Sequence, residues 1–481
     1  MNYAQLFPLL PTVILILAGM VIMLLEPFTA REKKSRLARL AILAAAIAAY
    51  CLSFQWNFRS RSVFNGMFIV DNYSVFFQWI FLVITGVSLL VSIRFNERES
   101  INRGEYYALL LFACSGMILM AVSGDLILTF LGLEILSIAT YILAGFRRTD
   151  PRANESSLKY FLLGSFATAF LLYGIALIYG ATGSTHYQTI RQLASFQGPP
   201  SLTLLAGMGL ILVGFGFKIA LVPFHSWVPD VYEGAPTPVT AFMTVGPKAA
   251  GFAALIRILT QALPALSADW TAVLWLISIL TMTLGNIVAV LQQNIKRMLA
   301  YSAIAHAGYL LVGIVANSNA GFGAVLFYLI VYTIMNLGAF SIVLSLSRAG
   351  DICVNLNDYS GLGRKSPFMA AALSLFLISL AGIPLTGGFI GKFYLFSAAI
   401  QQGYVGLTIF AVLNSVLSVY YYFRLMVIMY MKEPAADQPE PEPVPLPVLA
   451  IIVIGMAGIF FLGIYPGQML NLASISAIAL R

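Results

Sequence analysis

The sequence predicts an all-α polytopic membrane protein, a class indicated by its composition and by the spacing of its apolar runs. Of its 481 residues, 60% are hydrophobic and only 10% are charged, and the mean hydropathy is +0.89, too apolar for a water-soluble domain of this length. Runs of about 20 apolar residues, enough to span about 30 Å of hydrocarbon as a helix, recur throughout the chain. Uninterrupted runs favour helices over a β-barrel, because backbone groups in lipid must be satisfied within each segment.

Fourteen transmembrane segments are predicted within a single membrane domain that covers residues 1–481. In chain order their spans are 5–26, 36–56, 72–93, 104–121, 125–146, 155–179, 203–222, 238–258, 270–290, 298–316, 321–346, 368–396, 403–430 and 446–468. The acidic, proline-rich stretch 431–447 favours an extended, solvated linker before the final helix.

Two of these segments are interrupted by proline, the seventh in KIALVPFHSWVP (218–229) and the twelfth in SLAGIPLTGGFIGKF (379–393). Proline lacks a backbone N–H, so both helices are predicted to be discontinuous. They lie five segments apart, which suggests two five-helix repeats, 104–258 and 270–430. Because five is odd, the second repeat would be inverted relative to the first. Paired discontinuous helices indicate an ion or substrate site in transporters.

Basic residues indicate how the segments are oriented. Of the 27 lysines and arginines, eighteen lie in loops on one side of the predicted bundle and five on the other. The positive-inside rule places the richer side in the cytoplasm, so both termini are predicted to be periplasmic. This asymmetry accounts for most of the net charge of +8, and no basic patch indicates nucleic-acid binding.

The remaining four basic residues, Lys159, Lys218, Lys248 and Lys392, lie within predicted membrane segments. An ionisable group near the bilayer centre costs about 2.5–3.5 kcal/mol, so it indicates function by default. Lys218 is the sharpest case. Pro223 would leave a carbonyl beside it unpaired, and burial disfavours the charged form of a lysine, which suits a proton carrier. The alternative is that each lysine extends its charged end to the membrane interface.

Glu134 is the one carboxylate predicted to lie well inside a membrane segment. A lone buried carboxylate would be neutral or paired, and Lys218 is the partner we expect, because opposite charges about 4–6 Å apart favour ionisation of both groups. Moving Glu134 relative to Lys218 would then change the proton affinity of the lysine.

Three further residues are candidates for a proton relay. His225 and His306 qualify because a neutral imidazole can both accept and donate a proton, although each could equally be a hydrogen-bonded interior histidine. Lys159 lies four residues after Glu155, so a surface ion pair is the alternative to a place on the pathway.

The sequence contains no recognisable metal or cofactor site. Cys51, Cys114 and Cys353 are scattered without Cys-x-x-Cys spacing, which argues against a disulfide framework, a zinc site or an iron–sulfur cluster. GGFIGKF (387–393) ends like a phosphate-binding loop, but it has one residue too few between its glycines, and Phe393 stands where Ser or Thr is needed. We therefore expect neither a metal nor a cofactor in this chain.

Five stretches of the chain resemble the antiporter-like membrane subunits of respiratory complex I, the bacterial NADH-quinone oxidoreductase. They are LTFLGLEILSIATYIL (128–143), FGFKIALVPFHSWVPDVYEGAPTPVTAFM (215–243), TVGPKAAGF (244–252), NIKRMLAYSAIAHAGYLL (294–311) and AGIPLTGGFIGKFYLF (381–396). The resemblance covers almost the whole chain, and VYEGAPTPVTAFM is similar to the group of this family called subunit N. It implies fourteen helices with inverted repeats, and proton translocation coupled to quinone reduction elsewhere in the complex.

By position, the resemblance implies that Glu134 and Lys218 form an ion pair, that Lys248 is the central lysine and that Lys392 lies on the exit side. It also implies a bacterial inner membrane and other membrane-arm subunits as partners, with FMN, iron–sulfur clusters and quinone in partner subunits. One alternative is a subunit of a stand-alone cation/proton (Na⁺/H⁺) antiporter, which shares this fold and the lysines at 218 and 248. Another is a structural scaffold whose charges are vestigial.

Overall fold

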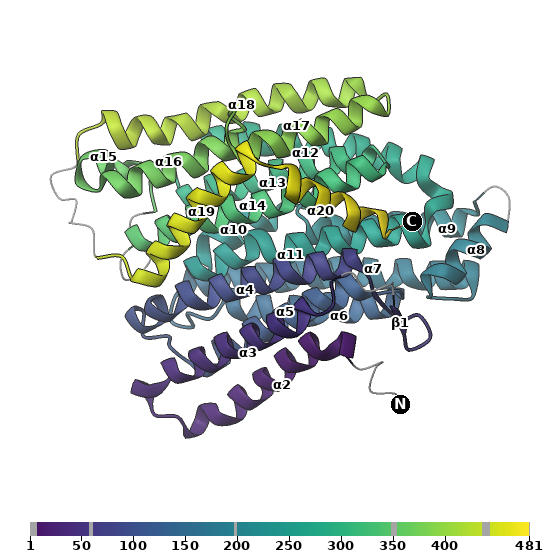
Figure 1. Cartoon of the computed structure of the whole chain (residues 1–481), viewed down its shortest axis with the longest axis horizontal. Helices are drawn as coiled ribbons and strands as arrows, with labels where there is room; N and C mark the ends of the chain where they lie inside the picture. Colours follow the sequence, from purple (N-terminus) through teal and green to yellow (C-terminus); the bar gives the residue numbers. More distant parts are fainter. Residues whose placement is uncertain (1–6, 57–60, 197–199, 348–353, 435–442, 481) are drawn as a thin grey trace.

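The computed structural model of the chain is a bundle of α-helices that run along a common direction (Figure 1). It describes residues 7–56, 61–196, 200–347, 354–434 and 443–480. Within these residues, twelve helices are long and apolar enough to cross a membrane. They are α2 (Leu10–Leu25), α3 (Ser35–Ser53), α4 (Asn72–Arg98), α5 (Gly104–Val122), α6 (Leu126–Ala144), α7 (Pro151–Thr182), α11 (Thr237–Arg257), α12 (Ser267–Leu291), α13 (Ile295–Val315), α14 (Asn319–Leu346), α18 (Val405–Met431) and α19 (Leu446–Ile464).

The two proline-interrupted segments are each divided into two shorter helices. The seventh segment consists of α9 (Leu202–Lys218) and α10 (Trp227–Gly234), and the twelfth of α16 (Pro367–Ala381) and α17 (Gly387–Gln401). All fourteen predicted segments are therefore helical, and both predicted interruptions are confirmed. The assignment of two inverted five-helix repeats stays a prediction.

The sixth segment illustrates how the predicted boundaries differ from the structure. It was expected at 155–179, whereas α7 begins at Pro151 and ends at Thr182. The side chain of Asp150 accepts a backbone hydrogen bond and caps the start of the helix, and Gly183 ends it with a left-handed φ of 68°. Both caps lie beyond the apolar run, so hydropathy alone places the ends of this helix too close together.

Three ordered elements lie where loops or chain ends were expected. Strands β1 (Arg61–Val63) and β2 (Phe68–Val70) form an antiparallel hairpin, and α8 (Tyr187–Phe196) lies in a predicted loop. The final segment ends earlier than expected, and after Pro466 a separate helix, α20 (Gly467–Ile478), packs against α14 and α4. The predicted span 446–468 includes both the end of α19 and the start of α20, because Pro466 does not interrupt an apolar run as a charged residue would.

Several short elements complete the described chain. They are the 3₁₀ turns η1 (Phe7–Leu9), η2 (Glu26–Phe28), η3 (Arg31–Lys33), η5 (Pro264–Leu266) and η6 (Leu356–Tyr359), the π-helix η4 (Ile258–Ala262) and α15 (Leu362–Lys365). Cys51 and Cys114 are free thiols. Cys353 and residues 435–442 of the predicted acidic linker lie outside the described residues.

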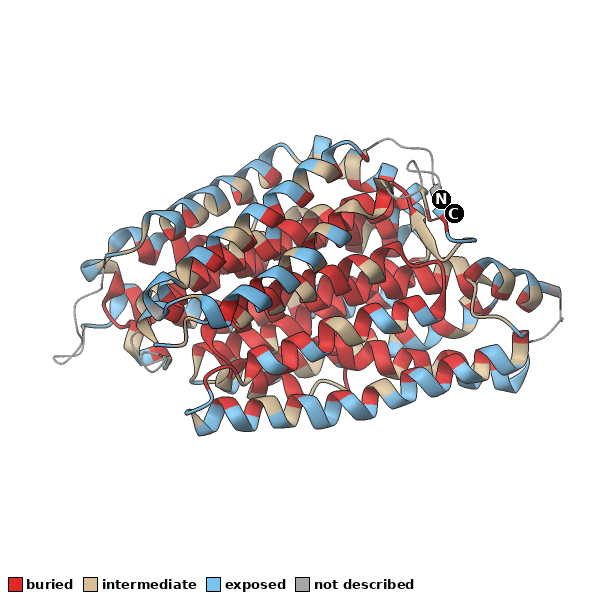
Figure 2. Ribbon diagram, turned by 90° about the horizontal axis from the view of Figure 1, so that it is seen from below, coloured by how far each residue is buried: buried red, intermediate tan, exposed pale blue. Residues whose placement is uncertain are grey.

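The centre of the bundle is formed by α11, α13 and α14. The most apolar stretch of each is 100%, 94% and 78% buried, against 33% for α7 and 22% for α19. Figure 2 shows the same contrast, with buried residues concentrated in the middle and exposed ones along the outer helices. Polar side chains on α11 and α13 are therefore shielded from lipid by the surrounding helices.

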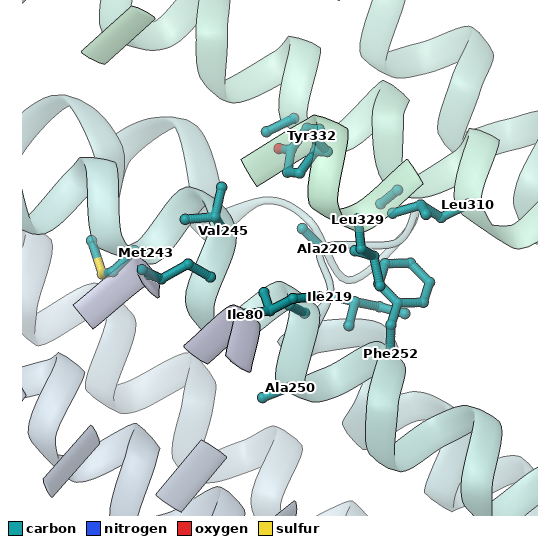
Figure 3. Close-up of a cluster of buried hydrophobic side chains, with 14 of the residues drawn as sticks. Ile80, Ile219, Ala220, Met243, Val245, Ala250, Phe252, Leu310, Leu329 and Tyr332 are labelled. Carbon is teal, nitrogen blue, oxygen red and sulfur yellow. The ribbon is translucent and has the colours of Figure 1, made fainter. Parts of the chain in front are cut away.

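The first part of the break between α9 and α10, residues 219–222, is buried among apolar side chains. Ala220 has a φ of 65°, in the left-handed region that few residues other than glycine adopt. Figure 3 shows Ile219 and Ala220 lying beside Ile80 of α4 and Phe252 of α11. Glycine is required at position 251 of α11, because a Cβ there would clash with Ile219. This packing holds the broken backbone close against the central helix α11.

The first and the last helix of the described chain have their outer ends at the same end of the bundle. The start of α2 and the end of α20 are seen together there, near β1 and α8 (Figure 1). This agrees with an even number of membrane crossings. The side of the membrane on which they lie stays a prediction.

Candidate functional site

Lys218 is the last residue of α9 and is 4% exposed. Its Nζ donates a hydrogen bond to Oγ of Ser137 on α6 at 2.9 Å and lies 6.0 Å from the centroid of the Tyr160 ring on α7. The end of α9 also favours a positive charge, because the last carbonyls of a helix carry partial negative charge. Ser137 is the one side chain or backbone group that accepts a hydrogen bond from this ammonium in the described chain. A hydroxyl of a neighbouring helix thus holds the ammonium, rather than the carbonyl freed by Pro223, which is that of Ile219.

Glu134 lies on α6, one helical turn before Ser137, and is half-buried. Its Oε1 accepts a hydrogen bond from Oγ1 of Thr168 on α7 at 2.8 Å. Because Ser137 accepts from Lys218 and lies one turn from Glu134 on α6, the carboxylate lies near the ammonium, but no direct ion pair joins the two among the residues that the structure describes. The two groups are therefore neighbours on one side of α6, each with its own hydroxyl partner.

Lys248 lies in the middle of α11, directly after the internal Pro247, and is 2% exposed. Proline removes the donor that the Met243 carbonyl would use in a regular helix, and the hydroxyl of Tyr232 on α10 donates to that carbonyl at 3.1 Å. The Nζ of Lys248 donates to the carbonyl of Ala303 on α13. The helix distortion beside Lys248 is thus satisfied by a residue from the second half of the broken seventh segment.

Lys392 on α17 is held by more partners than the other two lysines. It is 3% exposed, and its Nζ donates to the carbonyls of Leu380 and Ala381 at 3.0 and 2.9 Å and to Oγ of Ser415 at 2.9 Å. The two carbonyls belong to the last turn of α16, where the helix ends and leaves such groups without helical donors. An ammonium has three N–H donors, and here each has an acceptor. It also lies 4.7 Å from the centroid of the Tyr309 ring.

His306 lies in the interior on α13, one turn after Ala303, whose carbonyl accepts from Lys248, and one turn before Tyr309, whose ring faces Lys392. Its Nδ1 lies 2.6 Å from the hydroxyl of Tyr328 and its Nε2 lies 3.2 Å from the hydroxyl of Tyr422. Both ring nitrogens therefore have hydrogen-bond partners. The structure brings His306 together with the central and the last lysine, and it gives the histidine the hydrogen-bonded interior position that was one of the two interpretations.

His225 and Lys159 lie apart from these buried groups. His225 is half-buried in the break after α9, and within the described part of the chain its side chain has no hydrogen bond to any of the three lysines. The side chain of Lys159 is 42% exposed and forms ion pairs with Glu155 at 2.8 Å and with Asp230 at 2.9 Å. The surface pair expected from the i,i+4 spacing is thus present, and a second carboxylate joins it.

Sequence reasoning missed the network that Asp230 forms at this end of the bundle. Arg297 at the start of α13 contacts Asp230 at 2.9 Å and Glu233 at 2.8 Å, so α7, α10 and α13 are linked by ion pairs. A cavity of about 260 Å³ lies beside them, lined in part by Lys159, Asp230 and Glu233. Burial raises the pKa of Asp230, but hydrogen bonds from Lys159 and Arg297 outweigh that effect, and its pKa lies below the ordinary value.

The hydroxyl and aromatic partners of the lysines were also missed. Together with the partners of His306, these residues come from four different helices: Ser137, Ser415, Tyr309, Tyr328 and Tyr422. A serine or tyrosine in an apolar segment is common, and spacing along the chain does not indicate which of them will face a lysine on another helix. Lys296, placed in a loop by the topology argument, is in fact 1% exposed and donates to the carbonyl of Ala235 at 2.8 Å.

Metal binding finds no support in the described residues. They contain no group of three or more His, Cys, Asp or Glu side chains that could hold a metal ion. What the arrangement does offer is a set of proton-binding groups, namely three buried ammonium groups, one buried imidazole and one half-buried carboxylate, carried by α6, α9, α11, α13 and α17.

Comparison with known proteins adds an independent line of evidence. A family described as "NADH:quinone oxidoreductase/Mrp antiporter, TM" matches residues 123–418. NADH-quinone oxidoreductase subunit N of Trichlorobacter lovleyi is 48% identical over 479 residues, which cover 98% of each chain. Subunit N 1 of Solibacter usitatus is 44% identical over 476 residues, covering 98% of this chain and 97% of the relative.

Solved structures agree with the sequence relatives. A chain of respiratory complex I from Thermus thermophilus with bound aureothin superposes with a TM-score of 0.82 at 35% identity, over 96% of this chain and 99% of that one. A chain of the Mrp complex from Dietzia sp. DQ12-45-1b has a TM-score of 0.86 at 22% identity, covering 100% and 98%, and shares the fold. The chain therefore belongs to the NADH:quinone oxidoreductase/Mrp antiporter family of membrane proteins and, within it, to the subunit N group.

Proposed function

We propose that this chain is a proton-translocating membrane subunit of an NADH-quinone oxidoreductase, coupling quinone reduction in partner subunits to proton transfer along buried Glu and Lys residues. One observation carries the proposal. Lys218, Lys248 and Lys392 are each buried in the bundle, on or beside a helix that is interrupted or distorted by proline. Buried ammonium groups are costly in a membrane, so three of them at such positions are best explained by a function that needs their protons.

The first step of the proposed cycle takes place at Glu134 and Lys218. Protons enter from the cytoplasmic side toward Lys218, whose charged form is favoured by the nearby carboxylate. Glu134 is half-buried and held by Thr168 on α7, so a change of charge in a partner subunit beside α6 and α7 would act on it directly. Weakening the attraction between Glu134 and Lys218 would release the proton of the lysine toward Lys248, the next acceptor on the path.

In the second step, the proton moves from Lys248 toward Lys392. His306 lies between them, and its two nitrogens face the hydroxyls of Tyr328 and Tyr422. A hydroxyl can donate and accept at once, so these groups can pass a proton on without carrying a charge for long. Lys392 receives the proton and releases it on the outward side.

Two candidates from the sequence are given lesser places in this scheme. His225 stays a candidate relay near the first break. It forms no hydrogen bond with the lysines in the described chain, so water would have to connect it with them. Lys159 is left outside the path, because it is held by two carboxylates at the surface.

The proposal includes the surroundings of the chain. The partners are other membrane-arm subunits of complex I and the lipid bilayer, and no nucleic acid is involved. FMN, the iron–sulfur clusters and quinone belong to partner subunits, so this chain is a non-redox subunit of the translocase. It lies in a bacterial inner membrane with both termini in the periplasm.

The test uses the assembled complex in membranes. Replacing Lys218 by alanine is expected to lower the number of protons moved per NADH oxidised, because the first proton acceptor is lost. A Lys218→Ala complex that pumps at the normal ratio would rule out the proposed path.

The antiporter alternative is separated from this proposal by a second measurement. If the chain purified with sodium/proton exchange activity and without flavin or iron–sulfur partners, the function would be that of a stand-alone antiporter. The identity of 48% over almost the whole length to a subunit N favours the oxidoreductase subunit.

A further inference from the structure

Helix α4 carries a polar stripe that the proposed proton path does not use. Six polar side chains on this helix are each 0% exposed: Ser74, Gln78, Thr85, Ser88, Ser92 and Asn96. Because an α-helix turns about 100° per residue, they fall within about 80° of one another around its axis. The stripe therefore follows one face of α4 for most of its length, inside the bundle.

Most polar atoms of this stripe have no partner among the described protein groups. They are both amide atoms of Gln78, the hydroxyl oxygens of Thr85 and Ser88, and both amide atoms of Asn96. A buried polar group without a hydrogen bond costs about 1–3 kcal/mol in proteins. Six such atoms on one helix would be a large penalty unless something binds them.

The two hydroxyls of this set also avoid the usual solution for a buried hydroxyl on a helix, which is to donate to the carbonyl four residues earlier. Ser374 does so at 2.8 Å on α16 and Thr333 at 2.8 Å on α14. Thr85 and Ser88 do not, although both lie within the regular helix α4. The Ser88 hydroxyl is therefore available to a ligand, and the Thr85 hydroxyl lies beside the thiol of Cys114, a weak hydrogen-bonding group.

The stripe faces α5. The hydroxyl of Tyr106 on α5 lies 2.9 Å from Oγ of Ser92, and Cys114 on α5 adjoins Thr85. Buried ion pairs lie at both ends of α4. Asp71 binds Arg257 through two hydrogen bonds of 2.8 and 2.9 Å, and Glu99 lies 2.8 Å from Arg147.

We propose that α4 and α5 enclose a file of water molecules, bound by Gln78 toward one end and by Thr85, Ser88 and Asn96 toward the other. Water fits because the unpartnered atoms include both donors and acceptors, whereas a cation would be bound by acceptors alone and an anion by donors alone. A buried water typically makes about three hydrogen bonds, which matches closely spaced hydroxyl and amide groups. The ion pairs at the two ends keep the file from becoming an open pore.

This water file is separate from the lysines of the proposed proton path. Those lysines lie on α9, α11 and α17, and their hydrogen-bond partners lie on α6, α13, α16 and α18. Helix α4 contributes no hydrogen bond to any of them in the described chain. The water file can therefore be disproved while the proposed function stands, and the proposed function can be disproved while the water file stands.

The direct test is a cryo-EM map of the complete complex at a resolution that shows ordered water. We expect water density within hydrogen-bonding distance of Gln78 and along Thr85, Ser88 and Asn96. A map that shows water at other buried polar groups but none along α4 would overturn the proposal.

A second measurement compares stability in the assembled complex. Thr85→Val combined with Ser88→Ala keeps side-chain volume close to native but removes two hydroxyls. If those hydroxyls bind water, the substitution lowers the melting temperature; if they are dry and unpaired, their removal raises it. A melting temperature equal to or above that of the native complex would contradict the proposal. A single substitution, Ser88→Ala, is compared with the control Ser374→Ala, which removes a hydroxyl bound within its own helix. The control is expected to change the melting temperature less.

Discussion

The two broken helices of this protein hold their lysines in opposite ways. In the first, Lys218 ends the half-helix before the break and donates a single hydrogen bond to α6. In the second, Lys392 lies on the half-helix after the break and turns back to the end of α16, where two carbonyls and Ser415 accept from it. A proline break with a lysine nearby can thus produce either a sparsely held ammonium or a fully held one.

This difference suggests different tasks for the two lysines. A hydrogen bond to a charged group contributes about 1.5–3 kcal/mol, so three acceptors stabilise the charged form of Lys392 well beyond what one does for Lys218. Because Lys218 has a single acceptor, its charge is expected to depend more on the nearby carboxylate of Glu134. We therefore expect the first break to respond to changes elsewhere in the complex and the second to hold a proton until the path behind it is ready.

The largest effects are expected when Lys218 and Lys392 are each replaced by methionine, which is similar in length to lysine but uncharged. Lys392→Met is expected to abolish proton pumping and to lower the melting temperature of the complex, because two helix-end carbonyls lose their donor at a cost of about 1–3 kcal/mol each. Lys218→Met should also abolish pumping but should lower the melting temperature less. Equal losses of stability in the two variants would show that the two breaks do not differ as described.

The next effect concerns the charge beside the first break. Glu134→Gln keeps an oxygen that can accept from Thr168 but removes the charge that acts on Lys218. Pumping by the reconstituted complex is expected to fall several-fold. Thr168→Val is the matched control, since it removes the hydrogen bond and keeps the charge, and its effect should be smaller. If Thr168→Val lost more activity than Glu134→Gln, the hydrogen bond that positions Glu134 would matter more for pumping than the charge of Glu134.

A smaller effect is expected when one hydroxyl is removed beside each lysine. Ser137→Ala takes away the single acceptor of Lys218, whereas Ser415→Ala leaves Lys392 with two carbonyls. Coupled NADH oxidation should therefore fall more in Ser137→Ala than in Ser415→Ala. Activity assays on both variants in the same membranes make the comparison, and the reverse order would contradict the account.

The smallest effect concerns the surface network that holds α10, the half-helix after the first break. The pKa of Asp230 is lowered in the folded protein, so its contribution to stability is present above the ordinary carboxyl pKa of about 3.9 and is lost as pH falls through the folded value. Because Asp230 is 37% exposed, the contribution is expected to be below about 1 kcal/mol.

The check is the melting temperature of Asp230→Asn and native complexes as a function of pH. The difference between them should be small near pH 7 and should shrink as pH falls below about 4. A difference that grows toward acid would mean that the protonated form of Asp230 is the stabilising one.

Much of the fold follows from local properties of the sequence. Apolar runs predict each of the fourteen segments, and Pro223 and Pro384 predict where two of them break, because both signals act within a single helix. α20 was missed because it is only 12 residues long and includes Gln468, Asn471, Ser474 and Ser476, so it is too short and too polar to register as an apolar span. The polar stripe of α4 was missed for a different reason, because single hydroxyls and amides barely alter the hydropathy of a long apolar helix.

The site was predictable as a set of residues but not as a set of contacts. Lys218, Lys248 and Lys392 are identified by the cost of placing a charge in a membrane, which is a property of one residue in one segment. Their partners come from distant parts of the chain, as when Ser137 meets a lysine 81 residues later. Which hydroxyl faces which lysine depends on how whole helices pack against each other, and the periodicity of the sequence does not predict that packing.

The central claim is that buried lysines carry the protons, and Lys248 tests it most directly because it lies in the middle helix of the bundle. The measurement is the number of protons moved per NADH oxidised by the reconstituted complex with Lys248→Ala, beside Lys159→Ala as the surface control. The account predicts a lowered ratio for Lys248→Ala and a native ratio for Lys159→Ala. A native ratio in the Lys248→Ala complex would contradict it.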